Sequence, residues 1–535
     1  ALSARRFASF TDADFYRLDV REPIVIDVTL GDLPDSLKNF EAYRLFLRGW
    51  HPSQRELHDE PGEGLEDALT VRLTVADDLE PRWSLFSERA AAEAVERDLP
   101  YGERQRLAPT RLGASAGQHF SWGARSILNR IAQEPVGTAR NLAAASRSAR
   151  KSFSIEADGP VADAIDAVCS VATELGVEGG RRVAVALDAD AVALSGGALA
   201  LHDAEGVPLS NLGTGSSRLL AAGLQALATG GSSIALVDEL EHGLEPHRIA
   251  RLLHALGTKQ KTPPRQLFVT THSPVVVREL SAAELWVARR NREGKLTLTS
   301  ASAGGGDAQA ALRACAEAFL ASAVLVCEGA TEVGLVRGLD LHWTGEGALS
   351  LAVCGVSLAD GRGCGEMVKR ALVFARLGYR TALLHDADRD LASKDMTALS
   401  KAGVRRFCWE RPFHTEQQLF SSLPADCIGA MLQIATEVKG RASIHDSIRN
   451  ASKNALSLAD CEAGFVDWMR PYLGEAAHTG EWYKRIEPAE RVGREVLGPA
   501  LSRCTGALAR VLADLREWIE AGLQREPLDV DLAAN

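Results

Sequence analysis

The feature that most restricts the fold of this chain is a set of short apolar runs that end in acidic residues. Residues 234–237 read Ile-Ala-Leu-Val and lead directly into Asp238 and Glu239. Residues 323–327 and 381–384 repeat this design. Wholly apolar runs of this length are typical of strands buried on both faces, as in parallel sheets covered by helices. The pattern therefore predicts an α/β fold with acids at the carboxyl ends of its strands.

The length and composition are typical of a large cytoplasmic protein. A chain of 535 residues has room for about three to four domains, and a hydrophobic content of 46% supports a sizeable core. No apolar run approaches the ~18 residues of a membrane span, and no signal-peptide core is present at the N-terminus. The nine cysteines lack paired spacing, which is typical of buried thiols in a reducing compartment. We therefore expect a cytoplasmic protein without a membrane partner.

The charge of the chain gives no general sign of a nucleic-acid partner, because the formal net charge is −11. A DNA-binding surface can nevertheless be local. Clusters of Lys and Arg are concentrated after residue 360, although each cluster alone is more typical of a solvated surface.

The first part of the chain mixes strand-like and helical patterns. Strands are expected at residues 24–30, 69–75, 183–187 and 198–202, with a turn at residues 203–206. Residues 87–176 are rich in Ala, Arg and Glu at helical spacing, which predicts a helical insertion suited to dimerisation. After residue 206 strands alternate with helices, which predicts a doubly wound sheet.

The second part of the chain is expected to form a separate α/β unit. Residues 302–307 read Ser-Ala-Gly-Gly-Gly-Asp and are the best candidate for a linker. After about residue 426 the pattern is mostly helical and ends in an amphipathic stretch near residues 508–523. We therefore divide the chain into three regions, residues 1–300, 315–425 and 426–535.

Two segments of the first region carry residue types used in nucleotide sites. Gly213, Gly215 and Ser216 stand at the start of a helical run, where unpaired backbone N–H groups can bind an anion. Asp238 follows an apolar strand and can hold magnesium, and Glu239 can orient and deprotonate an attacking water. The simpler interpretations are a capped helix and a strand that ends in solvated acids.

A third segment completes the order found in one class of ATPase. His272 follows the next strand, where it can contact a terminal phosphate, although a lone loop histidine usually has no such role. Together the three segments and the Gly-Leu-x-Pro turn at residues 243–246 resemble the ABC/SMC-type ATPases over residues 205–285. The resemblance implies ATP, with Mg²⁺, as the ligand.

One motif of that family is missing from the sequence. No phosphate loop of the pattern Gly-x-x-x-x-Gly-Lys-Ser/Thr occurs. In that fold the loop lies on an early strand, and this chain opens at Ala1 without an initiator Met. We expect the loop to lie upstream of Ala1, with a degenerate ATPase as the alternative. The chain as given is then expected to hydrolyse ATP poorly or not at all.

Two strand ends of the second region carry a denser set of acids. Glu328 follows residue 327 directly, and Glu332 lies four residues further on, in the first turn of the expected helix. Asp386, Asp388 and Asp390 follow the later strand at alternate positions, so an extended chain would point them the same way. Both sets can meet at the carboxyl edge of one parallel sheet.

Clustered carboxylates of this kind indicate a metal site. Their mutual repulsion is costly unless a cation neutralises it, and oxygen ligands suit Mg²⁺ or Mn²⁺. Two such ions about 3.5–4 Å apart can stabilise the attacking and leaving oxygens of a phosphodiester displacement. The simpler interpretation is a pair of acidic surface turns.

The pattern Glu-Gly-x-Thr-Glu followed by Asp-x-Asp-x-Asp resembles the Toprim domain of topoisomerases, primases and some nucleases. The resemblance implies that Glu328, Asp386 and Asp388 are metal-binding and catalytic acids. Glu332 matches the second glutamate of the nuclease branch, and Asp390 matches the third acid of the topoisomerase pattern.

An ABC-type ATPase joined to a Toprim domain resembles the OLD (overcoming lysogenisation defect) family of nucleases, which includes the nuclease subunit of Gabija antiphage systems. The resemblance extends across most of the chain. It implies metal-dependent DNA cleavage regulated by the ATPase, a homodimer and, in some systems, a helicase-like partner. It also implies a lysine beside the metals, for which Lys484 is the candidate, and Glu416 is a candidate second-metal ligand. A surface lysine and a helix-start acid are the simpler interpretations.

The leading hypothesis is therefore a DNA endonuclease whose site uses two divalent ions. The alternative is a nucleotide-gated DNA clamp of the SMC-like repair class that binds DNA without cutting it. A topoisomerase or primase is less consistent with the sequence, which has no zinc ribbon and only six tyrosines.

Overall fold

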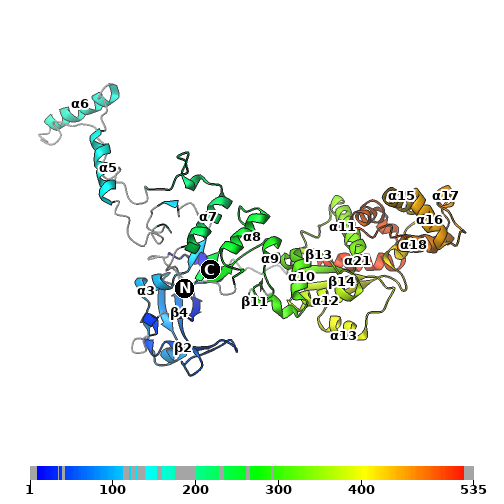
Figure 1. The fold of residues 1–535 in the computed structure, drawn as a ribbon, viewed down its shortest axis with the longest axis horizontal. Helices are drawn as coiled ribbons and strands as arrows, with labels where there is room; N and C mark the ends of the chain where they lie inside the picture. The colour runs from blue at the N-terminus through cyan, green and yellow to red at the C-terminus, as the bar shows by residue number, and fades with distance from the viewer. Residues whose placement is uncertain are drawn as a thin grey trace. The chain divides into compact units, whose positions relative to one another are not determined.

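The computed structural model describes residues 9–33, 35–38, 43–112, 120–121, 128, 139–152, 159–174, 199–227, 234–260, 265–290 and 295–522. The chain forms two compact units, residues 1–271 and 272–535 (Figure 1). The first unit contains an antiparallel sheet and a small parallel sheet, and the second contains a hairpin, a parallel sheet and a helical region.

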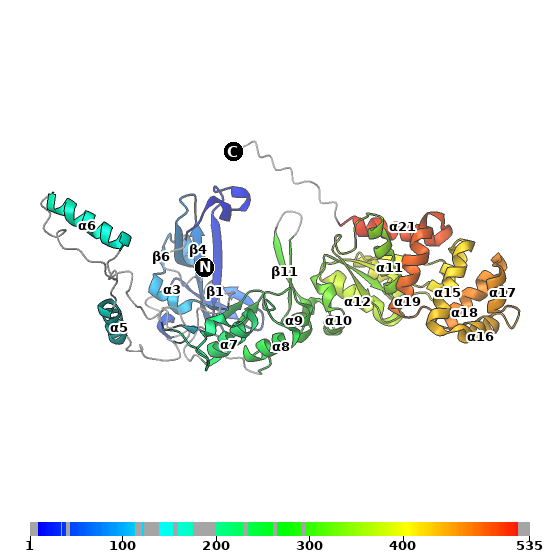
Figure 2. The ribbon, with the colours of Figure 1, turned by 90° about the horizontal axis from the view of Figure 1, so that it is seen from above.

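An antiparallel sheet forms the start of the first unit. Its strands are β1 (Ile24–Leu30), β2 (Leu47–His51), β3 (Glu56–His58), β4 (Glu66–Val75), β5 (Pro81–Phe86) and β6 (Arg97–Asp98). They follow the order β3-β2-β4-β5-β6, and β1 also pairs with β4, with Ile24 opposite Val75 and Leu30 opposite Leu69. Figure 2 labels β1, β4 and β6 of this sheet. The strands predicted at residues 24–30 and 69–75 are therefore confirmed.

The segment expected to be a helical insertion contains both helices and strands. Its described helices are α2 (Glu88–Ala92), α3 (Tyr101–Leu107), α5 (Ala139–Ser152) and α6 (Gly159–Glu174). Besides β6, it also contains β7 (Thr110–Leu112), which pairs in parallel with a later strand. Residues 87–176 thus contribute to both sheets of the unit as well as forming helices.

The strands expected near residue 200 are only partly within the described residues. Residues 183–187 lie outside them. Ala200 forms an isolated bridge with Ser121, and His202 forms one with Pro208. These described residues are not part of an extended strand. The expected turn is present, because the N–H of Gly206 donates to the carbonyl of Asp203 at 3.2 Å.

A three-stranded parallel sheet follows, in the order β7-β8-β9. Its later strands are β8 (Ile234–Val237) and β9 (Gln266–Val269), and they alternate with α7 (Thr214–Leu227) and α8 (Pro246–Ala255). Pro246 opens α8 at a position where its missing N–H costs nothing. Strands and helices alternate here as the sequence predicts.

The second unit opens with α9 (Pro274–Glu279) and the hairpin of β10 (Trp286–Arg290) and β11 (Leu296–Ser300). A 3₁₀ turn, η8 (Ala301–Gly304), leads into α10 (Ala308–Ala314) and η9 (Ala316–Leu320). The prediction that residues 302–307 form a linker is therefore wrong. Gly304 is buried, and a Cβ at this position would lie 2.9 Å from Val373 Cγ1, so the segment packs into the core.

The core of the second unit is a parallel sheet in the order β13-β12-β14-β15. Its strands are β12 (Ala323–Cys327), β13 (Val356–Asp360), β14 (Arg380–His385) and β15 (Arg405–Cys408). The helices that connect them are α11 (Ala330–Gly345), α12 (Cys364–Arg376) and α13 (Ser393–Lys401). Every residue of β12 is buried. Leu325 faces the core shared with α11, whereas Val324 and Val326 face the core shared with α12. These two helices cover opposite faces of the sheet (Figure 1).

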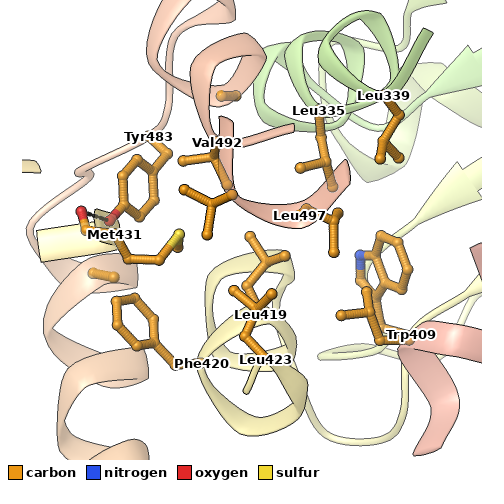
Figure 3. Packing of buried hydrophobic residues seen from close by; sticks show 14 of the residues in the cluster. Leu335, Leu339, Trp409, Leu419, Phe420, Leu423, Met431, Tyr483, Val492 and Leu497 are labelled. Atoms are coloured by element: carbon orange, nitrogen blue, oxygen red, sulfur yellow. Dashed lines mark hydrogen bonds between the residues drawn. The ribbon is translucent and has the colours of Figure 1, made fainter. Parts of the chain in front are cut away.

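The helical region predicted after residue 426 is confirmed. It follows α14 (Thr415–Ser422) and comprises α15 (Ile428–Lys439), α16 (Arg441–Ala451), α17 (Leu458–Ala463), α18 (Arg470–Thr479), α19 (Ile486–Arg491), a π-helix (Val492–Leu497), α20 (Gly498–Ala500) and α21 (Gly506–Glu520). This region shares one core with α11 and the sheet. In that core Tyr483 packs beside Met431 and donates its hydroxyl to the Met431 carbonyl at 2.7 Å (Figure 3).

A close helix crossing fixes the helical region to the sheet. A Cβ on Gly338 of α11 would lie 2.1 Å from the carbonyl oxygen of Glu490 in α19. Only glycine permits this approach. The first turn of α11, which carries Glu332, is thereby held at a set position relative to the segment before α19, which carries Lys484.

Two further observations concern the whole described chain. None of its described helices is long and apolar enough to cross a membrane. No disulfide joins any two cysteines in the part of the chain that the structure describes.

Candidate metal centre and nucleotide-binding elements

The carboxyl ends of β12 and β14 bring two of the predicted acids together. The strands are neighbours, with Cys327 opposite Leu384, so the residues after them emerge at one edge of the sheet. The backbone N–H of Asp386 donates to Oε2 of Glu328 at 2.9 Å. Burial raises the pKa of the Glu328 carboxyl, and the carboxylates of Asp386 and Asp388 raise it further.

A group of three possible metal ligands lies beside this contact. One ligand atom from each of Asp386, Asp388 and His414 lies within 4.8 Å of the others. The ring Nδ1 of His414 is 3.2 Å from Oδ2 of Asp386. The N–H of Thr415, the first residue of α14, donates to the other carboxylate oxygen at 2.8 Å. The start of α14 therefore stabilises negative charge on Asp386, although burial still raises the pKa of this carboxyl.

Glu332 joins the group through the hydroxyl of Thr415. It occupies the third position of α11, where Oε2 accepts the N–H of Gly329 at 2.9 Å. The Thr415 Oγ1 is 2.5 Å from Glu332 Oε1 and 2.9 Å from Asp386 Oδ1, and it accepts the indole N–H of Trp409 at 2.6 Å. A hydroxyl has one hydrogen to donate, so one of the two carboxyls must itself be protonated.

The proton belongs on Glu332. Burial and the neighbouring Asp386 carboxylate raise the pKa of Glu332 to about 8. A protonated Glu332 donates to the Thr415 hydroxyl, which then donates to Asp386. This arrangement satisfies every hydrogen of the network without a cation, and a metal ion would displace the proton.

Glu416 is a buried neighbour of the same group, and one of its carboxylate oxygens has no hydrogen-bond partner. Its side chain is 3% exposed, and its Oε1 has no hydrogen-bond partner. Its Oε2 is 3.6 Å from Nδ1 of His478, whose pKa the carboxylate raises. The His478 ring stacks on His414, with ring centroids 3.5 Å apart. A buried carboxylate oxygen without a partner is costly, and a cation ligand site would remove that cost.

Lys484 and Asp390 are not among the residues whose ligand atoms cluster in the structure. Lys484 is 41% exposed, with Nζ 3.9 Å from Glu481, but its charge lowers the pKa of His478, so it lies near the group. Asp390 is not among the clustered ligand atoms. Its carboxylate accepts from Arg411 at 2.6 Å, and the chain bends at residues 387–389, before it reaches Asp390.

This constellation fits a hard divalent cation. Glu328, Glu332 and Asp386 all have raised pKa values that burial causes first, so their charged forms lack neutralisation. Carboxylate oxygens with one imidazole nitrogen suit Mg²⁺ and, better, Mn²⁺. The structure thus brings Asp386, Asp388 and His414 together as one possible metal group, and the two-metal site stays a prediction.

In the first unit, the predicted phosphate-facing residues lie at the start of α7. Gly213 precedes this helix, and its carbonyl accepts the N–H of Ser217 at 3.0 Å. A Cβ on Gly215 would lie 2.4 Å from the carbonyl of Gly243, so the helix start packs against that turn. The Ser216 hydroxyl accepts from Arg248 at 3.1 Å.

The acids after β8 are exposed and are connected to the same helix. The Thr270 hydroxyl donates to Oδ1 of Asp238 at 2.5 Å and accepts the N–H of Glu239 at 2.9 Å. Glu239 has a positive φ of 43°, which is unusual for a residue with a side chain. Arg218 of α7 is buried and donates to the carbonyls of Asp238 and His242 at 3.0 and 3.2 Å.

The boundary between the two compact units falls, along the sequence, between these acids and His272. His272 stands three residues beyond β9 and is the first residue of the second unit. Its expected contact with a terminal phosphate stays a prediction.

Several residues of both sites were not identified from the sequence. They are His414, Thr415 and His478 in the second unit, and Arg218 and Thr270 in the first. His414 and Thr415 directly precede Glu416, so a strand end followed by a polar helix start was the available signal. The positions of His478 and Arg218 depend on contacts between distant segments and have no local signal.

Comparison with known proteins identifies one part of the chain. Residues 35–278, slightly under half of the sequence, match the family described as AAA domain, putative AbiEii toxin, Type IV TA system. This part of the chain therefore contains an ATPase domain of the AAA or ABC type, for which ATP with Mg²⁺ is the implied ligand. No curated protein matches the chain.

Proposed function

We propose that this protein is a metal-dependent DNA endonuclease of the OLD type, whose AAA-type ATPase domain regulates a Toprim nuclease site. The observation that carries the proposal is the contact between the ends of β12 and β14. There Glu328 accepts the N–H of Asp386, and Asp388 and His414 complete a half-buried set of ligands. Adjacent parallel strands that each end in such acids support the Toprim assignment.

The ligands divide into those at the strand ends and those on helices. Glu328, Asp386 and Asp388 are the proposed catalytic acids, and Glu332 and Glu416 complete a second cation site beside them. Two bound Mg²⁺ or Mn²⁺ ions would supply charge to stabilise the attacking and leaving oxygens of a phosphodiester. His414 adds an imidazole ligand, which favours Mn²⁺ over Mg²⁺. Asp390 is not proposed as a ligand, because Arg411 already neutralises it.

Lys484 is the proposed cation for the reacting phosphate. It follows Tyr483, whose carbonyl accepts the Thr331 hydroxyl at 3.4 Å, and Thr331 precedes Glu332 in α11. The lysine is therefore attached to the same framework as the ligands. Its partial exposure leaves the ammonium able to reach a bound strand.

The first unit is proposed to regulate cleavage through ATP. Gly213, Gly215 and Ser216 at the start of α7, with Asp238 and Glu239 after β8, are the proposed nucleotide-binding residues. Arg218 connects the two segments and would transmit a change at one to the other. A homodimer, a helicase-like partner and a role in antiphage defence belong to the same proposal.

The domain limits follow the same division. The sequence predicts an ATPase domain over residues 1–300 with an insertion over 87–176, a Toprim domain over 315–425 and a helical region over 426–535, and we propose this order of domains with one change of boundary. The hairpin β10–β11 and α10 pack in the compact unit of the Toprim sheet, so residues 272–314 act structurally with the second domain.

The test is cleavage of supercoiled plasmid DNA by the purified chain against a panel of divalent metals, with and without ATP. We expect nicking with Mg²⁺ and Mn²⁺ that is abolished by Asp386→Ala, while the oligomeric state is unchanged. Persistent cleavage by Asp386→Ala would sink the proposal. Tight DNA binding without cleavage in any metal would instead support the alternative of a nucleotide-gated DNA clamp.

A further inference from the structure

A cavity of about 590 Å³ lies beside the metal group, on the other side of the segment that follows β14. His385, Ala387 and Arg389 line this cavity, whereas Asp386 and Asp388, which alternate with them, supply the metal ligands. The remaining wall comes from β15, the loop after it and the start of α13. The cavity and the metal group therefore share one segment of the chain.

The charge of the cavity is positive. Three of its lining residues are arginines, Arg389, Arg406 and Arg411, and one is an acid, Asp390. Arg411 pairs with Asp390 at 2.6 Å. Arg389 is 84% exposed, with Nε 3.5 Å from Oδ2 of Asp388, so its guanidinium lies between the cavity and the metal group. An anion in the cavity would meet two guanidinium groups in excess of the one carboxylate.

Two polar atoms of the cavity wall are buried without a hydrogen-bond partner. They are Nε of Arg406 and Nε2 of His385. The His385 ring contacts the carbonyl of Asp386 through Nδ1 at 2.6 Å, so Nδ1 carries the hydrogen and Nε2 is left as an acceptor. Buried polar atoms without partners are rare in folded proteins, and a ligand that offers both an acceptor and a donor would satisfy them.

The uncharged part of the wall is mixed, with Ser393 and Thr397 beside apolar side chains. Met396 of α13 contacts the guanidinium of Arg406 through its sulfur, and the Trp409 ring is buried against the cavity. A cavity of this volume exceeds a single phosphate and has room for the sugar or base attached to it. Ser393 at the start of α13 belongs to the same wall.

We propose that this cavity binds a phosphoryl group with its attached nucleoside, supplied by the DNA strand that lies across the metal group. The inference rests on the proposed nuclease function and adds a substrate subsite to it. Arg406 and Arg389 bind the phosphate oxygens, and Arg411 exchanges part of its contact with Asp390 for the ligand. The subsite would hold the strand next to the reacting phosphodiester and fix its direction.

The experiment compares Arg406→Gln with Arg405→Gln. The two arginines are neighbours on β15, but Arg405 is 62% exposed beside Asp514 and does not line the cavity. Binding of a fluorescein-labelled single-stranded oligodeoxynucleotide is measured in EDTA, where no cleavage can occur. We expect Arg406→Gln to weaken binding about ten-fold, since a charge-assisted contact to phosphate is lost. We expect Arg405→Gln to bind as the unmodified chain does.

The salt dependence of binding and a second variant test whether the lost contact is one to a phosphate in the cavity. The slope of log Kd against log salt concentration should fall by about 0.7 in Arg406→Gln, the value for one lost single-strand phosphate contact. Arg389→Gln changes an exposed residue that the fold does not need, and it should weaken binding in the same direction. This variant keeps the test valid if Arg406→Gln fails to fold.

A parallel measurement uses inorganic phosphate as the probe, followed by the broadening of its phosphorus resonance. Loss of phosphate binding in Arg406→Gln with unchanged oligonucleotide binding would assign the cavity to free phosphate instead of the DNA strand. Equal behaviour of Arg406→Gln and Arg405→Gln with both probes overturns the proposal, as does absence of binding of either probe to the unmodified chain. Because no cleavage is measured, these outcomes are independent of whether the protein proves to be a nuclease.

Discussion

The strand ends after β8 and β14 have the same local sequence design and different environments. Each strand is apolar and leads into acids, and in each case a threonine hydroxyl contacts the first aspartate. Asp238 and Glu239 are exposed. The side chain of Asp386 is 17% exposed, and its carboxyl has a raised pKa because of burial.

The difference comes from what covers each strand end. At β14 the start of α14, the first turn of α11 and α18 all approach the acids, so that Glu332, Glu416 and His478 gather around Asp386. At β8 Thr270 and Arg218 satisfy backbone groups and one carboxylate oxygen, and the exposed His242 lies 3.8 Å from the Glu239 carboxylate. The same sequence signal therefore marks a buried charge cluster in one unit and a solvated strand end in the other.

The largest expected contrast is between Glu328→Gln and Glu239→Gln, which make the same chemical change after β12 and β8. Glu328→Gln removes a proposed metal ligand, and we expect plasmid nicking with Mn²⁺ to fall by at least about a hundred-fold. Glu239→Gln should leave nicking without nucleotide unchanged, because Glu239 is proposed to act only on ATP. Equal loss of nicking in both variants would remove the distinction between a catalytic and a regulatory strand end.

The second contrast concerns the pH dependence of stability without metal. The pKa of Glu332 is raised to about 8 in the folded chain, so the folded state binds a proton that the unfolded state releases near its ordinary pKa of 4.5. Glu332 makes its whole contribution to the free energy of unfolding below pH ~4.5, and that contribution is lost as the pH rises to about 8. The upper bound of the loss is roughly 5 kcal/mol.

Urea unfolding in EDTA at several pH values measures this effect. The variant Glu332→Gln should lose stability less steeply between pH ~5 and ~8, and Mn²⁺ should restore stability to the unmodified chain at the higher pH. An unchanged pH profile in Glu332→Gln would mean that this carboxyl is not protonated in the folded chain.

The smallest expected effects come from the two threonines. Thr415→Val removes the acceptor of the Trp409 N–H and the donor to Asp386, both buried, and should reduce the free energy of unfolding by about 2–3 kcal/mol. Thr270→Val removes a contact to an exposed carboxylate and should cost about 1 kcal/mol or less. Chemical denaturation of the two variants in EDTA makes the comparison, and a larger loss in Thr270→Val would contradict the burial argument.

Local sequence patterns were sufficient to locate the strands that carry the acids. The apolar runs at 234–237 and 323–327 form β8 and β12 with the bounds expected, because a short wholly apolar run has few other ways to be buried. Glu332 lies in the first helical turn as its spacing predicts. The expected linker at 302–307 failed, since glycine there permits close packing against α12 and does not provide flexibility.

The same local patterns did not show which of the neighbouring acids belong to the candidate metal group and which do not. Asp390 follows Asp386 and Asp388 at the expected spacing, yet it pairs with Arg411 at the cavity, beyond the bend at residues 387–389. The arginine-lined cavity was likewise invisible in the sequence. Arg389 follows β14, whereas Arg406 and Arg411 belong to β15 and the loop after it, and these two segments meet only where β14 and β15 lie side by side.

The sequence by itself determined which residue types stand at the end of each strand, because apolar runs and their polar ends are local properties of the chain. Only the tertiary structure decided which of those ends is buried, since burial depends on helices contributed by distant segments. At β14 those segments bring His414, Glu416 and His478 to Asp386. The charge that must be neutralised, and with it the proposed metal centre, arises from that packing.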